Sequence, residues 1–96
     1  MSRLSVIQKQ ADVIKSLAAS FGAGNVRIFG STSHQRDRQT SDLDLLIDWN
    51  SPHSLFDQVA LQQSLEDLLN IKVDLVTAKN LHWYVKDRIL EEAIPL

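Results

Sequence analysis

The chain has 96 residues, of which 44% are hydrophobic and 23% charged, and a formal net charge of −2. This length suits one hydrophobic core, so we expect a single domain over residues 1–96, and the slightly acidic balance argues against a nucleic-acid-binding role. The absence of cysteine excludes disulfides and thiolate chemistry. No signal peptide and no apolar run of roughly 20 residues is present, so we expect a cytoplasmic protein without membrane contact.

The first part of the chain predicts one helix and one strand. Apolar residues recur at three- and four-residue spacing over residues 4–21, which indicates a single amphipathic helix. Gly22 and Gly24 follow and favour a helix end. The β-branched and aromatic run over residues 26–29 then predicts a strand that ends at Gly30 and Ser31. Residues 32–40 are polar and predict a loop.

The clearest strand pattern covers residues 42–49, where apolar and polar positions nearly alternate. One predicted face carries Leu43, Leu45, Ile47 and Trp49, and the other carries Asp42, Asp44, Leu46 and Asp48.

The remainder predicts a helix, a strand and a final helix. Ser54 is placed to cap a helix that runs to about residue 69 and closes at Asn70. Its expected buried residues are Leu55, Val59, Leu61, Leu65, Leu68 and Leu69. A strand over residues 71–76 and a helix over about 80–94 follow. The element order predicts an α+β fold, a small mixed sheet flanked by helices, in which the second and third strands are parallel.

Three aspartates carry the chemical signal. Asp42 and Asp44 leave the same face of one strand, roughly 6.6 Å apart. Asp74 lies on the polar face of the next strand and joins them if the two strands are neighbours. Carboxylates at this spacing repel by roughly 2.5 kcal/mol, and oxygen ligands without His or Cys favour Mg²⁺ or Mn²⁺. Mg²⁺ usually keeps positions for phosphate, so a nucleotide is the expected ligand.

Gly30 and Ser31 stand where backbone N–H groups and a hydroxyl can hold phosphate oxygens. Each signal alone has an ordinary explanation, since acids commonly occupy the wet face of a strand and Gly-Ser is common in turns. Their combination at compatible separations favours a site.

The string Gly30-Ser31, nine residues, then Ser41-Asp42-Leu43-Asp44-Leu45 and later Val73-Asp74-Leu75-Val76 resembles the DNA-polymerase-β-like nucleotidyltransferase superfamily. The short length resembles its minimal nucleotidyltransferases. The resemblance implies that Gly30 and Ser31 bind the triphosphate of ATP. It also implies that Asp42, Asp44 and Asp74 hold Mg²⁺ and act as the catalytic residues of a two-metal reaction.

Many members of this family have an Arg where this chain has His34, so Arg36 or Arg38 is the candidate to reach the phosphates, with a solvated charged loop as the equal alternative. The resemblance further implies a protein adenylyltransferase that transfers AMP to a hydroxyl, as in HEPN/MNT toxin-antitoxin systems. There the antitoxin modifies a tyrosine of a HEPN-domain RNase toxin. The alternatives are a noncatalytic antitoxin that acts by occlusion and, less favoured, a structural or metal-sensing domain.

The final helix carries two apolar stripes, and only one can face the core. Leu81, Tyr84, Val85, Ile89 and Ala93 form one stripe, and Trp83, Leu90 and Ile94 form the other. The second stripe is either a surface for a partner or for a homodimer, or it is covered by the C-terminal tail. The histidines at 34, 53 and 82 lack metal-ligand spacing, and Asp48 is expected to lie beyond the metal cluster.

Overall fold

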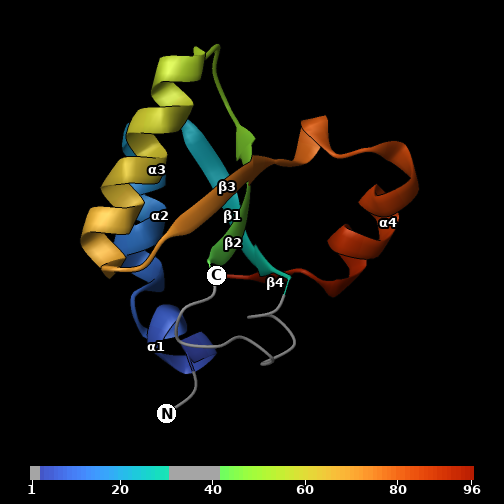
Figure 1. The fold of residues 1–96 in the computed structure, drawn as a ribbon. Coiled ribbons are helices and arrows are strands. Elements are labelled where there is room, and N and C mark those ends of the chain that lie inside the picture. The colour runs from blue at the N-terminus through green and yellow to red at the C-terminus, as the bar shows by residue number, and fades with distance from the viewer. Residues whose placement is uncertain (1–2, 31–41) are drawn as a thin grey trace.

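The computed structural model describes residues 3–30 and 42–96. Its elements are α1 (Arg3–Lys9), α2 (Ala11–Ser20), β1 (Ala23–Phe29), β2 (Leu43–Trp49), α3 (Leu55–Leu69), β3 (Val73–Thr77), the 3₁₀ helix η1 (Ala78–Asn80), α4 (Trp83–Glu92) and β4 (Ile94–Pro95). The four strands form one sheet in the order β3-β2-β1-β4 (Figure 1). β1 is antiparallel to β2 and β4, whereas β2 and β3 are parallel. The mixed sheet confirms the predicted α+β fold.

The hydrophobic core lies between the sheet and the layer formed by α2 and α3, while α4 lies on the other side of the sheet (Figure 1). Its fully buried side chains include Ile7, Ile14, Ile28, Leu43, Leu45, Ile47, Leu61 and Leu65. The inward face predicted for residues 42–49 is therefore confirmed. Leu46, on the other face of β2, is also completely buried.

The single helix predicted over residues 4–21 is wrong, because the chain turns at Gln10 between α1 and α2. The N–H of Gln10 bonds to the carbonyl of Ile7 at 3.0 Å in this turn. An unbroken 18-residue helix would extend about 27 Å, whereas a seven-residue strand spans only about 23 Å. Ile7 of α1 and Ile14 of α2 are both fully buried.

Helix α3 begins and ends as predicted. Ser54 and Asp57 form a capping box, and Asn70 ends the helix in the left-handed conformation with φ 55°. The predicted buried side was too wide. Leu61, Leu65 and Leu69 are buried, but Leu55, Val59 and Leu68 are exposed. At about 100° per residue, Leu68 and Leu55 lie at the two margins of the buried stripe and Val59 points away from it.

Three polar side chains of α3 cover the outer edge of β3. The Gln58 Nε2 donates to the Leu75 carbonyl at 3.2 Å, the Leu75 N–H donates to Gln62 Oε1 at 3.4 Å, and the Val73 N–H donates to Glu66 Oε2 at 2.9 Å. These residues are spaced four apart, so they share one face of the helix. They satisfy backbone groups that an edge strand otherwise leaves open, and they fix the strand that carries Asp74.

The end of the chain differs from the predicted helix over residues 80–94. Helix α4 is shorter, and Ile94 pairs with Ile28 of β1 as part of β4. Pro95 explains the change, because the residue before a proline disfavours the helical conformation. The tail therefore lies against β1 and leaves Trp83 80% exposed. Among the described residues, no helix is both long and apolar enough to cross a membrane.

Candidate active site

The strand register brings the predicted acids to one place. Asp44 of β2 is paired with Asp74 of β3, and with Phe29 of β1 on its other side. Directly paired residues share a face of the sheet, with neighbouring strands about 4.8 Å apart. Asp42 lies immediately before β2 and is exposed, as is Asp74, whereas Asp44 is partly buried. The structure thus places these acids at the same end of two adjacent strands.

The neighbouring acids and burial both affect the pKa of Asp44. Burial raises its pKa from the ordinary 3.8 to about 6, with further increases from the negative charges of Asp74 and Asp42 and from a side-chain hydrogen bond with Asp74. The positive charge of Arg3 in α1 opposes this rise of the pKa. Sequence reasoning missed Arg3, because nothing in the pattern of α1 indicates that its start lies near the end of β2.

Gly30 is positioned directly against Asp44. It has φ 71°, a left-handed backbone that side chains rarely adopt, and a Cβ at this position would overlap the Asp44 carboxylate. Both observations explain why glycine is needed here. The other two predicted phosphate ligands, Ser31 and Arg36, lie outside the described residues.

The donor set of this cluster fits a hard divalent cation. All three donors are carboxylates, which Mg²⁺ and Mn²⁺ accept, and the repulsion that raises the Asp44 pKa is what a cation would relieve. Within residues 3–30 and 42–96, however, no group of three His, Asp or Glu side chains is arranged to hold a metal ion. The predicted convergence of three acids is therefore present as a neighbourhood of side chains, without a closed coordination sphere.

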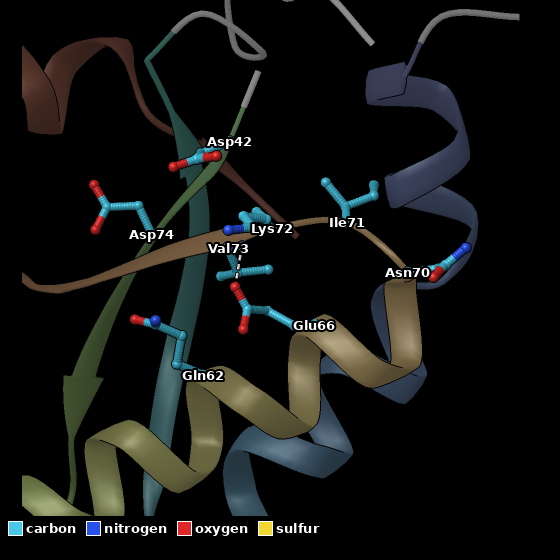
Figure 2. A pocket seen from close by; sticks show the side chains of 8 residues that line it. All are labelled: Asp42, Gln62, Glu66, Asn70, Ile71, Lys72, Val73 and Asp74. Atoms are coloured by element: carbon cyan, nitrogen blue, oxygen red, sulfur yellow. Dashed lines mark hydrogen bonds between the residues drawn. The ribbon is translucent and has the colours of Figure 1, made fainter. Parts of the chain in front are cut away.

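A hollow of about 600 Å³ opens beside Asp42 and Asp74, between the outer edge of β3 and α3 (Figure 2). Its lining consists of Asp42, Gln62, Glu66, Asn70, Ile71, Lys72, Val73 and Asp74. The side chains of Gln62 and Glu66 approach from the helix and those of Asp42 and Asp74 from the strands (Figure 2). The hollow is polar and open, which suits access of a solvated reactant to Asp74.

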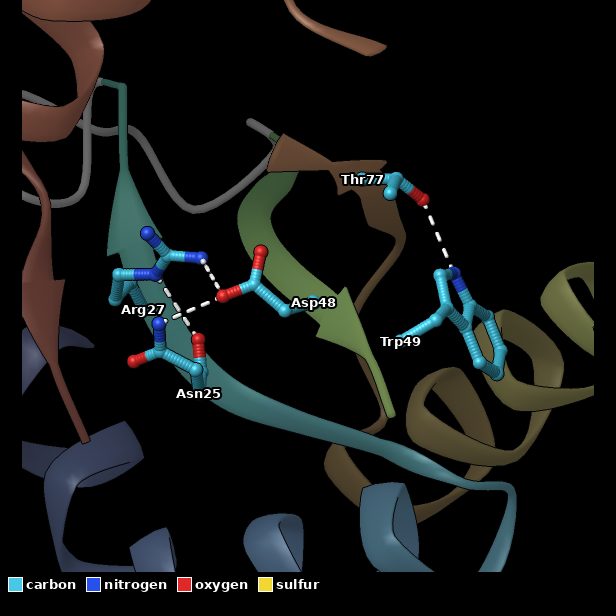
Figure 3. A network of polar contacts seen from close by, with 5 residues as sticks. All are labelled: Asn25, Arg27, Asp48, Trp49 and Thr77. Carbon is cyan, nitrogen blue, oxygen red and sulfur yellow. Dashed lines mark hydrogen bonds and ion pairs between the residues drawn. The ribbon is translucent and has the colours of Figure 1, made fainter. Parts of the chain in front are cut away.

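Asp48 belongs to a separate polar network on the same strand (Figure 3). Its Oδ2 lies 3.2 Å from Arg27 Nη2 and accepts a hydrogen bond from Asn25 Nδ2 at 2.7 Å. The Arg27 Nε also donates to the Asn25 carbonyl at 2.9 Å. The Arg27 side chain is only 11% exposed, so Asp48 compensates a nearly buried charge. This network gives Asp48 a structural role apart from the three acids.

The described histidines are engaged in ring contacts. His53 stacks on Trp49 with ring centroids 4.1 Å apart, and His82 lies 4.2 Å from the ring of Tyr84.

A small mixed sheet with helices on both sides, two acids on a central strand, a third on its parallel neighbour and a left-handed glycine define a domain of the nucleotidyltransferase class. The family model for polymerase beta nucleotidyltransferases matches residues 8–96. The chain belongs to this family and is a nucleotidyltransferase.

Two relatives illustrate the similarity. A candidate protein adenylyltransferase of Methanocaldococcus jannaschii is 38% identical over 90 residues, which span 93% of this chain and 89% of the relative. The protein adenylyltransferase MntA of Thermococcus cleftensis is 32% identical over 83% of this chain and 81% of its own length.

Solved structures agree with the fold. A candidate minimal nucleotidyltransferase is 38% identical and superimposes with a TM-score of 0.87, covering 97% of this chain and 95% of that one. More distant structures share the fold at about one fifth identity. One is a toxin-antitoxin complex with AMP-PNP, with a TM-score of 0.75, 20% identity, and coverage of 88% of this chain and 70% of that one. Another is an MNT antitoxin in complex with a tri-AMPylated Shewanella oneidensis HEPN toxin, with a TM-score of 0.69, 19% identity, and coverage of 92% and 69%.

Proposed function

We propose that this chain transfers AMP from ATP to a hydroxyl group of a HEPN-type RNase toxin, most simply a tyrosine hydroxyl, and thereby acts as its antitoxin. The adenylyltransferase named among its relatives supports the transferred group. The fold shared with an MNT antitoxin bound to an AMPylated HEPN toxin supports the acceptor. The AMP-PNP in a related complex supports ATP as the donor.

The observation that carries the proposal is the pairing of Asp44 with Asp74 across β2 and β3, next to Gly30. Asp42, Asp44 and Asp74 would hold Mg²⁺, which when bound neutralises phosphate charge and lowers the pKa of the attacking hydroxyl. The Gly30 backbone has no side chain to block a phosphate and lies against Asp44. The chain therefore supplies a surface on which a triphosphate and the catalytic acids meet.

The reaction follows from this arrangement. The acceptor oxygen forms a bond to the α-phosphorus of ATP as the bond to pyrophosphate breaks, and the hydroxyl proton passes to a carboxylate or to water. Asp74 is suited to take this proton, because it is exposed and lines the hollow at the edge of β3. Asp44, partly buried between Asp74 and Phe29, is suited to act as a fixed ligand.

The test is to incubate the chain with ATP, Mg²⁺ and a purified HEPN-domain protein encoded beside it, and then to weigh that protein by mass spectrometry. Addition of AMP to the acceptor, lost in the Asp42→Asn, Asp44→Asn double variant, is the expected result. Asp48→Asn is the matched control, since it removes an acid from the same strand but not from the cluster. An acceptor that is inhibited yet unmodified would instead support neutralisation by occlusion.

A further inference from the structure

A second cavity lies on the side of Asp44 that faces away from Asp74. It has a volume of about 330 Å³ and is formed between the end of β1 and α4. Its lining consists of Phe29, Gly30, Val85, Arg88, Ile89 and Glu92. Phe29, Val85 and Ile89 contribute apolar side chains to this lining, whereas the hollow at β3 is lined mainly by polar ones. Val85 and Ile89 belong to the apolar stripe of the last helix that was expected to face the core. In the structure they line this cavity.

The strand register connects this cavity to the catalytic acids. Asp74, Asp44 and Phe29 are successive partners across β3, β2 and β1, so they form a row on one face of the sheet. With strands about 4.8 Å apart, Phe29 lies roughly 10 Å from Asp74. Gly30 closes the connection, because it lines the cavity and also lies against the Asp44 carboxylate. A ligand held at Asp44 can therefore extend directly into the cavity.

We propose that this cavity binds the base of the nucleoside triphosphate, with Phe29 on one side and Val85 and Ile89 on the other. The inference rests on the proposed function and adds to it where the nucleoside lies. A base is a flat ring with apolar faces, and stacking on an aromatic side chain is its usual mode of recognition without sequence readout. The volume lies at the low end of small-molecule sites, which suits a nucleoside better than a protein segment.

The rim of the cavity offers polar groups for the edge of the base. Arg88 Nε lies 3.5 Å from Glu92 Oε1 across one helical turn of α4, and both residues line the cavity. The side chains of Arg88 and Glu92 are 80% and 36% exposed, so the pair can offer hydrogen-bond donors and acceptors to the edge of a base, while Phe29, Val85 and Ile89 offer apolar surface. With the base in this cavity, the acceptor protein can approach from the opposite side of Asp44, where Asp74 and the polar hollow lie.

The test separates base binding from phosphate binding. Binding of ATP and of inorganic tripolyphosphate, each with Mg²⁺, is measured by calorimetry on the full chain and on Phe29→Ala and Ile89→Ser variants. We expect ATP to bind about 10- to 100-fold more weakly to Phe29→Ala, with tripolyphosphate unchanged. Ile89→Ser alters the opposite wall of the cavity, which α4 provides. Because α4 has no buried residues, this variant should fold, and it checks the result if Phe29→Ala folds poorly. Phe56→Ala, at a side chain 84% exposed on α3, is the control and should bind as the wild type.

Equal weakening of ATP and tripolyphosphate, or no weakening of either, would overturn the inference and leave the proposed function intact. A raised KM for the acceptor protein with unchanged ATP binding would also overturn it, because the cavity would then hold the acceptor. A wild-type chain that binds neither ATP nor tripolyphosphate would overturn the proposed function and the inference together.

Discussion

Asp44 and Asp74 are register partners in adjacent parallel strands and share a side-chain hydrogen bond. Such a bond requires a proton on one of the two carboxyl groups, so it adds to burial and to the charges of Asp74 and Asp42 in raising the pKa of Asp44 to about 6. Without a cation, the cluster is therefore a source of repulsion that the remainder of the fold must offset. This cost is expected of a site prepared for a positively charged ligand.

The raised Asp44 pKa predicts how stability depends on pH when no metal is present. The folded chain holds a proton on Asp44 up to pH about 6, whereas the unfolded chain releases it near 3.8. Folding is therefore progressively less favoured as the pH rises from about 4 to about 6 and stays so above it. Asp44→Asn removes this effect, so in EDTA the variant should gain stability over the wild type as the pH rises. After allowance for solvent screening the gain is on the order of 1 kcal/mol, or roughly 4–8 °C in Tm.

The measurement is thermal unfolding of both proteins in EDTA at pH 4 and pH 7.5, with Mg²⁺ added in a second series. Mg²⁺ should raise the Tm of the wild type at pH 7.5 and leave that of Asp44→Asn nearly unchanged. A difference in Tm between the two proteins that does not depend on pH would contradict the assigned electrostatics.

Gly30→Ala should remove activity by a steric effect that another glycine can control. The substitution forces a side chain into a left-handed backbone and against the Asp44 carboxylate, at a cost of about 1–2 kcal/mol. Gly22→Ala makes a similar demand, because Gly22 has φ 86° and a Cβ there would meet the Ser51 hydroxyl. Gly22 precedes the end of the β1–β2 pair at which Ala23 pairs with Trp49, opposite to the end that carries Asp44. Both variants should lose stability in chemical denaturation, but only Gly30→Ala should lose adenylyl transfer by at least tenfold. Equal loss of transfer in both would refute a specific role for Gly30.

The sequence predicted those parts of the fold in which local pattern and tertiary packing agree. The alternation of residues 42–49 places Leu43 and Asp44 on opposite faces in any sheet. Ser54 caps α3 through a contact with Asp57, only three residues further along the chain. The proximity of Asp74 was predicted because a helical connection between adjacent strands makes them parallel. These inferences depend on short-range geometry.

The errors came from features set by distant parts of the chain. The turn at Gln10 depends on the length of the sheet that α2 covers, and β4 depends on the open edge of β1, which pairs with Ile94. The influence of Arg3 on Asp44 depends on where α1 lies after that turn. The turn at Gln10 and the position of Arg3 leave no local signal, whereas Pro95 is a local sign that the last helix ends before Ile94. For Leu55 the periodicity was compatible with a buried side that the helix does not use.

Asp48→Asn should reduce stability without reducing catalysis, although Asp48 shares its strand with Asp44. The change removes the negative charge that pairs with Arg27, whose side chain is 11% exposed. The new amide oxygen can still accept the hydrogen bond from Asn25, but the ion pair is lost. Loss of one partner of a buried pair costs about 3–5 kcal/mol, and the 43% exposure of the Asp48 side chain reduces the expected cost to roughly 1–2 kcal/mol. Chemical denaturation and the transfer assay check the two parts separately. A transfer rate as low as that of Asp44→Asn would show that Asp48 belongs to the catalytic cluster.

Glu66 gives a prediction about the edge of the sheet. Its carboxylate accepts the Val73 N–H at 2.9 Å, immediately before Asp74, and so holds the outer edge of β3 against α3. Glu66→Gln keeps an acceptor oxygen at this position and should unfold within about 0.5 kcal/mol of the wild type. Glu66→Ala removes the acceptor and should cost about 1–2 kcal/mol, and it should also increase aggregation because an open strand edge can pair with another chain. Urea denaturation and light scattering on the three proteins test this, and equal behaviour of the Gln and Ala variants would mean that the edge is held by Gln58 and Gln62 alone.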